Sequence, residues 1–166
     1  SGWEGTNWID EIAMEDAAVQ NHSLSITGAG EDIVYALGFS YYDQQGIIGG
    51  DITDAGLKRL TARMNTELVL FKNQTRDIFK VGENFTYTNT ENKNIGTGNM
   101  YWNELHSAIV TNPFVPTSWE KTPDLNGFSP SLEGWGGGDP RATLFYRHNY
   151  KWGKSNKITG NVYGEI

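Results

Sequence analysis

Alternating side chains along residues 33–42 (IVYALGFSYY) constrain the fold more than any other feature of the sequence. Successive side chains of a β-strand point to opposite faces, so this stretch divides into two sets. One set is large and apolar: Ile33, Tyr35, Leu37, Phe39 and Tyr41. The other is mostly small: Val34, Ala36, Gly38, Ser40 and Tyr42. The second face of a half-buried soluble strand is normally polar, but the second face of this stretch is mostly small, which leaves open which face meets water.

The same alternation recurs in residues 21–27, 57–68 and 78–90. Residues 57–68 also fit a helix, because their leucines recur at helical spacing, but the neighbouring strands favour a strand. As a strand, one face would hold Leu60, Ala62, Met64 and Leu68. The other face would hold Arg59, Thr61, Arg63, Asn65 and Glu67. In 78–90, Glu83 interrupts the apolar face, which indicates a bulge or local exposure.

The connections between these strands alternate between short and long. Residues 28–31 and 72–77 are short turns, whereas 43–56 and 91–156 are long. Outer-membrane barrels have short turns at one end and long loops at the other. We therefore predict an all-β fold, an antiparallel meander that is part of a large transmembrane β-barrel, with a helical and irregular long-loop insertion.

In that fold the apolar face would meet lipid, and the face with Arg59 and Arg63 would line a wet interior. Tyr41 and Tyr42, before the first long loop, would suit an aromatic girdle. A soluble β-sandwich with those polar residues facing solvent fits the periodicity equally well.

We expect 1–166 to be a single fragment of such a barrel. Residues 1–19 would form a linker, 20–90 four antiparallel strands, 91–156 a long loop with a short helix, and 157–166 a further strand. The linker also fits a short amphipathic helix, but a connector that packs a Trp is favoured. The helix in the long loop would lie within 98–110 and stop before Pro113. A start at Ser1 and a strand-like C-terminal run predict a piece of a longer protein.

Composition excludes several chemistries. The chain contains no Cys, which removes disulfides, Cys-type zinc sites and thiol nucleophiles. Its net charge of −7 argues against a nucleic-acid partner. Three His residues lack metal-ligand spacing, and no catalytic motif is present. We therefore predict no enzyme activity, no metal and no cofactor.

Aromatic residues of the long insertion are the candidate substrate contacts. Flat rings can stack on sugars, and the candidates are Trp102, Trp119 and Trp135. The favoured interpretation is that these rings fasten the long loop to the rest of the fold. The alternative is that the whole chain is a soluble, Trp-rich carbohydrate-binding β-sandwich module.

Several ordered motifs resemble the TonB-dependent outer-membrane receptors of the SusC/RagA type. The run QNHSLSITGAGEDIVYALGFSYYDQQGIIGG, residues 20–50, is the most similar. It departs from the family pattern at Ala29 and Gln45, where Gly and Glu are expected. Further similar segments follow the same order: TNWIDEI (6–12), KRLTARMNTEL (58–68), KVGENFTYT (80–88), MYWNELHSAIVTNPFVPT (100–117) and GDPRATLFYRHNYKWGKSNKITGNVYGEI (138–166).

The resemblance implies a fragment from the N-terminal part of a plugged barrel in the Gram-negative outer membrane. Such a receptor imports nutrients, most often glycan oligosaccharides or else peptides. Its partners would be TonB and a SusD-like surface lipoprotein. The fragment itself would not be transport-competent. Isolated from its barrel, it is expected to self-associate through open strand edges and its apolar face.

Overall fold

The computed structural model describes residues 5–95, 101, 103–117, 128, 138–148 and 153–166. The chain divides into two compact units. The strand unit comprises residues 19–43, 57–91 and 153–166, and the loop unit comprises 1–18, 44–56 and 92–152.

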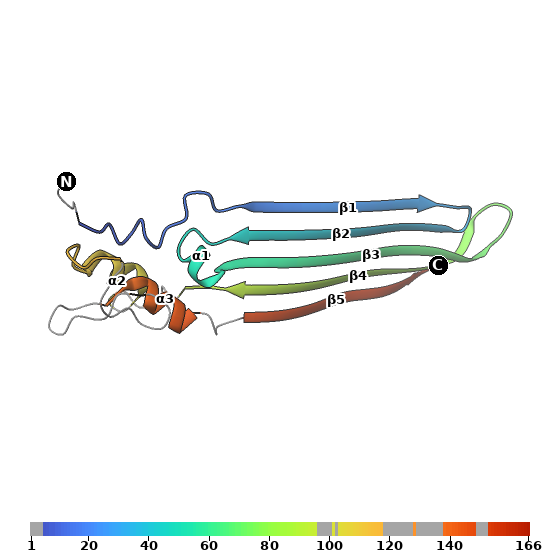
Figure 1. The fold of residues 1–166 in the computed structure, drawn as a ribbon. Coiled ribbons are helices and arrows are strands. Elements are labelled where there is room, and N and C mark those ends of the chain that lie inside the picture. Colours follow the sequence, from blue (N-terminus) through green and yellow to red (C-terminus); the bar gives the residue numbers. More distant parts are fainter. Residues whose placement is uncertain (1–4, 96–100, 102, 118–127, 129–137, 149–152) are drawn as a thin grey trace. The chain divides into compact units, whose positions relative to one another are not determined.

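Five strands form one sheet in the order in which they occur along the chain. They are β1 (Val19–Ala29), β2 (Ile33–Gln45), β3 (Gly56–Lys72), β4 (Asp77–Lys93) and β5 (Gly153–Glu165). Neighbouring arrows run in opposite directions in Figure 1, so the sheet is an antiparallel meander. The predicted all-β meander is confirmed, and residues 57–68 are strand and not helix.

Two short turns join β1 to β2 and β3 to β4. The Gly30 amide donates to the Ile33 carbonyl oxygen at 2.7 Å, and the Asn73 amide donates to the Arg76 carbonyl oxygen at 2.9 Å. The Asn73 side-chain oxygen also accepts from the amides of Thr75 and Arg76, at 2.8 and 3.0 Å. An Asn side chain that bonds the backbone ahead of it stabilises such a turn.

The strands are longer than the sequence pattern predicted. β3 and β4 extend past 57–68 and 78–90 at both ends, and β5 begins at Gly153 instead of residue 157. The reason is that backbone pairing continues after the apolar alternation has ended. Polar residues such as Asp43 and Glu91 therefore belong to strands.

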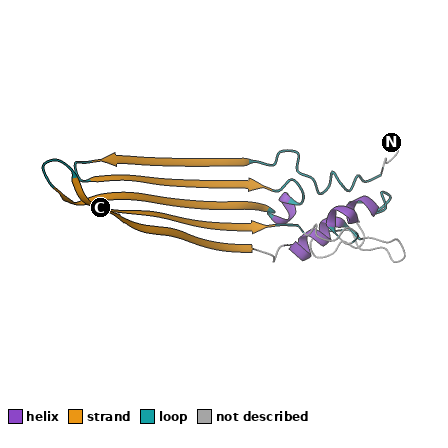
Figure 2. Cartoon of the chain, turned by 180° about the vertical axis from the view of Figure 1, so that it is seen from behind, coloured by secondary structure: helices purple, strands orange, loops and turns teal. Residues whose placement is uncertain are grey.

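The sheet is exposed on both faces. Every residue of β5 is exposed, and large apolar side chains of all five strands remain accessible. All strands in the described part of the chain belong to this one sheet (Figure 2). A sandwich core between two sheets is therefore not seen among the described residues.

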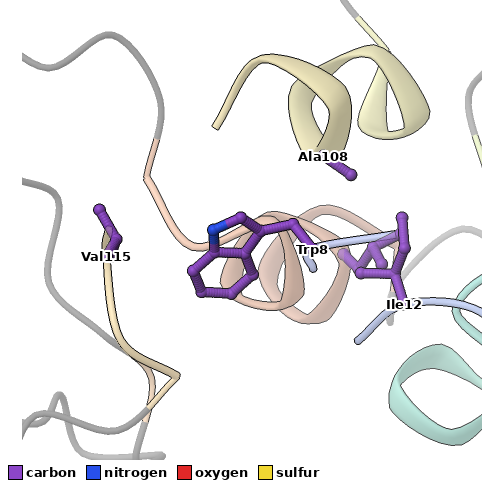
Figure 3. Packing of buried hydrophobic residues seen from close by; sticks show 5 residues of the cluster. Trp8, Ile12, Ala108 and Val115 are labelled. Atoms are coloured by element: carbon purple, nitrogen blue, oxygen red, sulfur yellow. The ribbon is translucent and has the colours of Figure 1, made fainter. Parts of the chain in front are cut away.

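The loop unit contains the buried apolar cluster. Its buried members are Trp8, Ile12, Ala108, Val115 and Leu144. Figure 3 shows the Trp8 ring between Val115 and Ala108. Residues 8–12 reach this cluster through consecutive turns, where the sequence also allowed a helix. The Trp8 ring nitrogen donates to the Asn112 carbonyl oxygen at 3.1 Å, which satisfies its polar group.

Among the described residues of the loop unit there are three short helices: α1 (Gly50–Thr53), α2 (Glu104–Val110) and α3 (Pro140–His148). Helix α2 lies within the predicted range 98–110 but begins at Glu104, because the Asn103 side chain accepts from the His106 amide at 2.8 Å as its N-cap. The expected short helix in 91–156 corresponds to α2, and α3 is a further helix that the sequence pattern did not indicate. Asp139 caps α3 by accepting from the Arg141 amide at 2.9 Å.

Candidate functional site

The two faces of the sheet have different chemistry, and the side-chain contacts define which residue lies on which face. The Tyr35 ring covers Gly28 on β1, and the Phe85 ring packs beside Gly160 on β5. On the opposite face, a Cβ added at Gly38 would lie 3.8 Å from the Cβ of Arg63. The sequence prediction of one large apolar face and one small or polar face therefore describes the sheet correctly.

Large apolar side chains form a continuous exposed band across all five strands, which we call the apolar face. Its exposed large members are Leu24, Ile26, Ile33, Tyr35, Phe39, Tyr41, Leu60, Met64, Leu68, Leu70, Phe85, Ile158 and Val162. A contiguous apolar surface of this kind marks a site of contact with lipid or with another protein.

Glu83 lies within the apolar face without causing a bulge. Phe79 packs beside Gly164, and Phe85 packs beside Gly160. Both pairs share one face, so the alternation of β4 continues across Glu83, which is half-buried. The predicted local irregularity is therefore absent at this position.

A polar border ends the apolar face toward the long connections. The Tyr41 hydroxyl donates to Asp43 at 3.0 Å, and the Tyr87 hydroxyl donates to Asn156 at 2.9 Å. Beyond these tyrosines lie two ion pairs, Asp43 with Lys58 at 3.9 Å and Glu91 with Lys154 at 2.8 Å. Tyr rings with an apolar body and a hydroxyl directed to a polar zone are typical of a membrane–water interface.

Tyr42 does not belong to this border, although the sequence suggested a girdle of both tyrosines. Its ring lies on the opposite face, where the Arg59 guanidinium stacks over it at 5.5 Å from the centroid. Adjacent residues of a strand cannot share a face. Tyr41 is thus a border residue, and Tyr42 is part of the polar face.

The opposite face is polar, and we call it the polar face. Near its centre a shallow hollow of about 270 Å³ is lined by Ser23, Ser25, Gly38, Ser40, Thr61 and Arg63, and Leu24 and Phe39 also border it. Toward the short turns, the Tyr163 ring crosses Gly82 and its hydroxyl donates to Glu67 at 3.2 Å. Glu67 also pairs with Lys80 at 3.7 Å. Hydroxyl and charged groups on this face fit a surface in contact with water.

In the loop unit, Arg141 forms the densest polar cluster. Its guanidinium binds Asp139 at 2.8 Å and Glu11 at 3.1 Å, and it also donates to the Thr117 carbonyl oxygen. Its plane lies 5.5 Å from the Trp8 ring centroid and 6.0 Å from that of Phe128. The hydrogen bond with Asp139 raises the pKa of Arg141 above its usual value. The guanidinium therefore stays charged and links three segments that are distant in sequence.

Arg141 was not among the candidate residues predicted from the sequence, although its position could have been located. Asp followed by Pro is a strong helix start, because Asp caps and Pro suits the first helical position. The predicted contacts Trp102, Trp119 and Trp135 lie outside the described residues. No group of three or more metal-binding side chains occurs among the residues with described positions.

None of the helices in the described part of the chain is long and apolar enough to cross a membrane. No protein-family model matches the sequence. Over 128 residues, which make up 77% of this chain, the sequence is 28% identical to TonB-dependent receptor P26 of Formosa agariphila. The match spans about 11% of that receptor's length. This similarity supports a relationship to the TonB-dependent receptor family.

Proposed function

We propose that this chain is part of the barrel wall of an outer-membrane TonB-dependent transporter of the SusC/RagA type. The observation that carries the proposal is the exposed apolar face with its polar border of Tyr41 and Tyr87. In a transmembrane barrel the apolar face meets lipid and the polar face lines the interior. The similarity to a TonB-dependent receptor independently supports this role.

The transporter would import nutrients across the Gram-negative outer membrane, with glycan oligosaccharides as the favoured class and peptides as the alternative. Its partners would be TonB, which supplies the energy, and a SusD-like surface lipoprotein. Within it, this chain contributes strands from the N-terminal part of the barrel and their long extracellular connections. Catalysis is not part of the proposal.

The length of the apolar face suits this role. On β3 it extends from Leu60 to Leu70. A strand tilted by about 45° crosses the hydrocarbon core in about 9–11 residues. β3 as a whole has 17 residues, so its ends would project beyond the core on both sides. The ion pairs of Lys58 and Lys154 then lie at the level of the lipid headgroups.

Nitroxide labels on two consecutive residues test the orientation. Phe39 belongs to the apolar face and Ser40 to the hollow of the polar face. In the full-length protein in lipid vesicles, a label at Phe39→Cys should collide more often with oxygen, which concentrates in lipid. A label at Ser40→Cys should collide more often with a water-soluble nickel chelate.

Lys58→Cys serves as the control, because Lys58 lies in the polar border and should be accessible to nickel despite its position on the lipid side. Stronger nickel collisions at Phe39 than at Ser40 would contradict the proposed orientation. Import is tested separately in the host. Deletion of the gene should abolish uptake of a fluorescent glycan oligosaccharide, and unchanged uptake would contradict the transport role for that substrate class.

A further inference from the structure

The hollow of the polar face contains a cation, Arg63, whose side chain has no counter-charge among the residues with described positions. Arg63 makes no hydrogen bond and no ion pair with any other residue that the structure describes. Its neighbours in the hollow are Ser23, Ser25, Ser40 and Thr61, with Gly38 between them. Because Gly38 has no side chain, a ligand can approach the sheet directly beside the guanidinium.

The charge around the hollow is opposite to that of the whole chain. Arg59 lies on the same face, four residues before Arg63 on β3, and its guanidinium stacks over Tyr42 at 5.5 Å from the ring centroid. Lys157 also belongs to this face, because its neighbour Asn156 contacts Tyr87 on the apolar face. Glu67, the nearest carboxylate of β3 on this face, is engaged by Tyr163 and Lys80. The chain as a whole carries a net charge of −7.

At the level of residues 59–65 of β3, the other polar-face positions hold neutral side chains and Lys157. Alternation along the strands assigns these neutral positions as Asn21, Ser23, Ser25, Thr27, Ala36, Gly38, Ser40, Tyr42, Asn84, Thr86, Thr88, Thr90, Ser155, Thr159 and Asn161. Three cations and no carboxylate thus share a surface rich in hydroxyl and amide groups.

We propose that this hollow binds an acidic oligosaccharide, with Arg63 holding a carboxylate or sulfate group of the sugar. A guanidinium presents a planar pair of donors that matches the two oxygens of such a group. Serine and threonine hydroxyls both donate and accept hydrogen bonds, so they suit the hydroxyls of a sugar ring. Arg59 and Lys157 add long-range attraction for the same ligand. The inference rests on the proposed function, since it requires the polar face to line a water-filled interior.

Binding of a fluorescent glucuronate tetrasaccharide to the full-length protein in detergent tests this site. Arg63→Gln should weaken binding about 10- to 100-fold, which corresponds to the loss of a charge-assisted hydrogen-bonded pair. Arg63→Lys should be intermediate, because it keeps the charge but loses the planar fork. Arg76→Gln is the matched control, since it removes a charge at the turn between β3 and β4, outside the hollow, and should change affinity little.

Three ligand outcomes would overturn the proposal. These are unchanged affinity in Arg63→Gln, equal binding of a neutral glucose tetrasaccharide, and equal or tighter binding of a glutamate tetrapeptide. Accessibility gives a fourth readout. A charged methanethiosulfonate reagent should modify Ser25→Cys, a variant that keeps Arg63, in the ligand-free protein, and the glucuronate tetrasaccharide should slow the reaction.

An unreactive thiol in the ligand-free protein would show that another segment covers the hollow, which would also overturn the proposal. The spin labels at residues 39 and 40 report the orientation of the sheet independently. Correct orientation with unchanged binding in Arg63→Gln would reject only the sugar site. A failed orientation test would reject the proposed function itself.

Discussion

Replacing Met64 by Arg should strongly destabilise the protein in a membrane, whereas the same replacement at Asn65 should not. The two residues are adjacent in the middle of β3 (Gly56–Lys72) and point to opposite faces. Met64 belongs to the apolar face and is 38% exposed, so no protein layer shields it. Asn65 lies on the polar face beside the hollow.

The magnitude follows from the depth of Met64. Strands rise about 3.3 Å per residue, and a tilt of about 40° leaves about 2.5 Å of depth for each residue. Leu60 and Leu68, four residues away on either side, then lie about 10 Å from the level of Met64. With an apolar band about 25 Å tall, Met64 lies near its centre, where Arg costs about 2–4 kcal/mol. At Asn65 the change should remain within about 0.5 kcal/mol.

Urea unfolding of the full-length protein in lipid vesicles measures both values, and heat-modifiable mobility on gels reports whether each variant folds. Met64→Gln separates polarity from charge and should cost less than Met64→Arg. Equal destabilisation at residues 64 and 65, or a larger effect at 65, would refute the assignment of the two faces.

Three further predictions concern packing and assembly. Gly82→Ala should lower the free energy of unfolding by about 1–3 kcal/mol, because a Cβ there meets the Tyr163 ring. Gly38→Ala meets only the Arg63 Cβ at 3.8 Å, so it should be nearly neutral in the same unfolding assay. Arg141→Met should cost about 2–3 kcal/mol in the loop unit, less than the loss from a fully buried pair, because Asp139 is fully buried while Arg141 is 18% exposed. Hydrogen exchange at the α3 amides should then accelerate about 30- to 160-fold. Lys154→Met, which removes an exposed pair, should change exchange little, and unaltered α3 exchange in Arg141→Met would disprove a stabilising role. The isolated chain should associate through the edges of β1 and β5 and through its apolar face, so a concentration-independent monomer in light scattering would count against an open, uncovered sheet.

The faces of the sheet were predictable because their period is set by the backbone. Once residues 33–42 are a strand, Leu37 and Gly38 must lie on opposite sides. The pairing of β1 with β2 and of β3 with β4 was predictable for a related reason, because each pair is joined by a short turn. The ends of the strands were harder to predict. Asp43 and Glu91 still pair within the sheet, but no apolar alternation marks them as strand residues.

Contacts between segments distant in sequence could not be predicted from local patterns. The crossing of Gly82 by Tyr163 depends on the register between β4 and β5, which no periodicity defines. The same holds for the hollow at Arg63, which requires β1, β2 and β3 to be aligned. The Arg141 cluster joins residues 11, 117 and 139, and only the Asp139–Pro140 helix start could have located one of its members.

The connection between β4 and β5, residues 94–152, has a consequence for the order of assembly. The hairpins β1–β2 and β3–β4 close through turns of a few residues, so each can form within microseconds. Pairing of β5 requires closure of a much longer loop, and the entropy lost on closure grows with the logarithm of loop length. The fifth strand should therefore dock last. Gly160 and Gly164 of β5 lie against Phe85 and Phe79, and Gly82 of β4 lies against Tyr163, so docking of the fifth strand completes this interleaved packing.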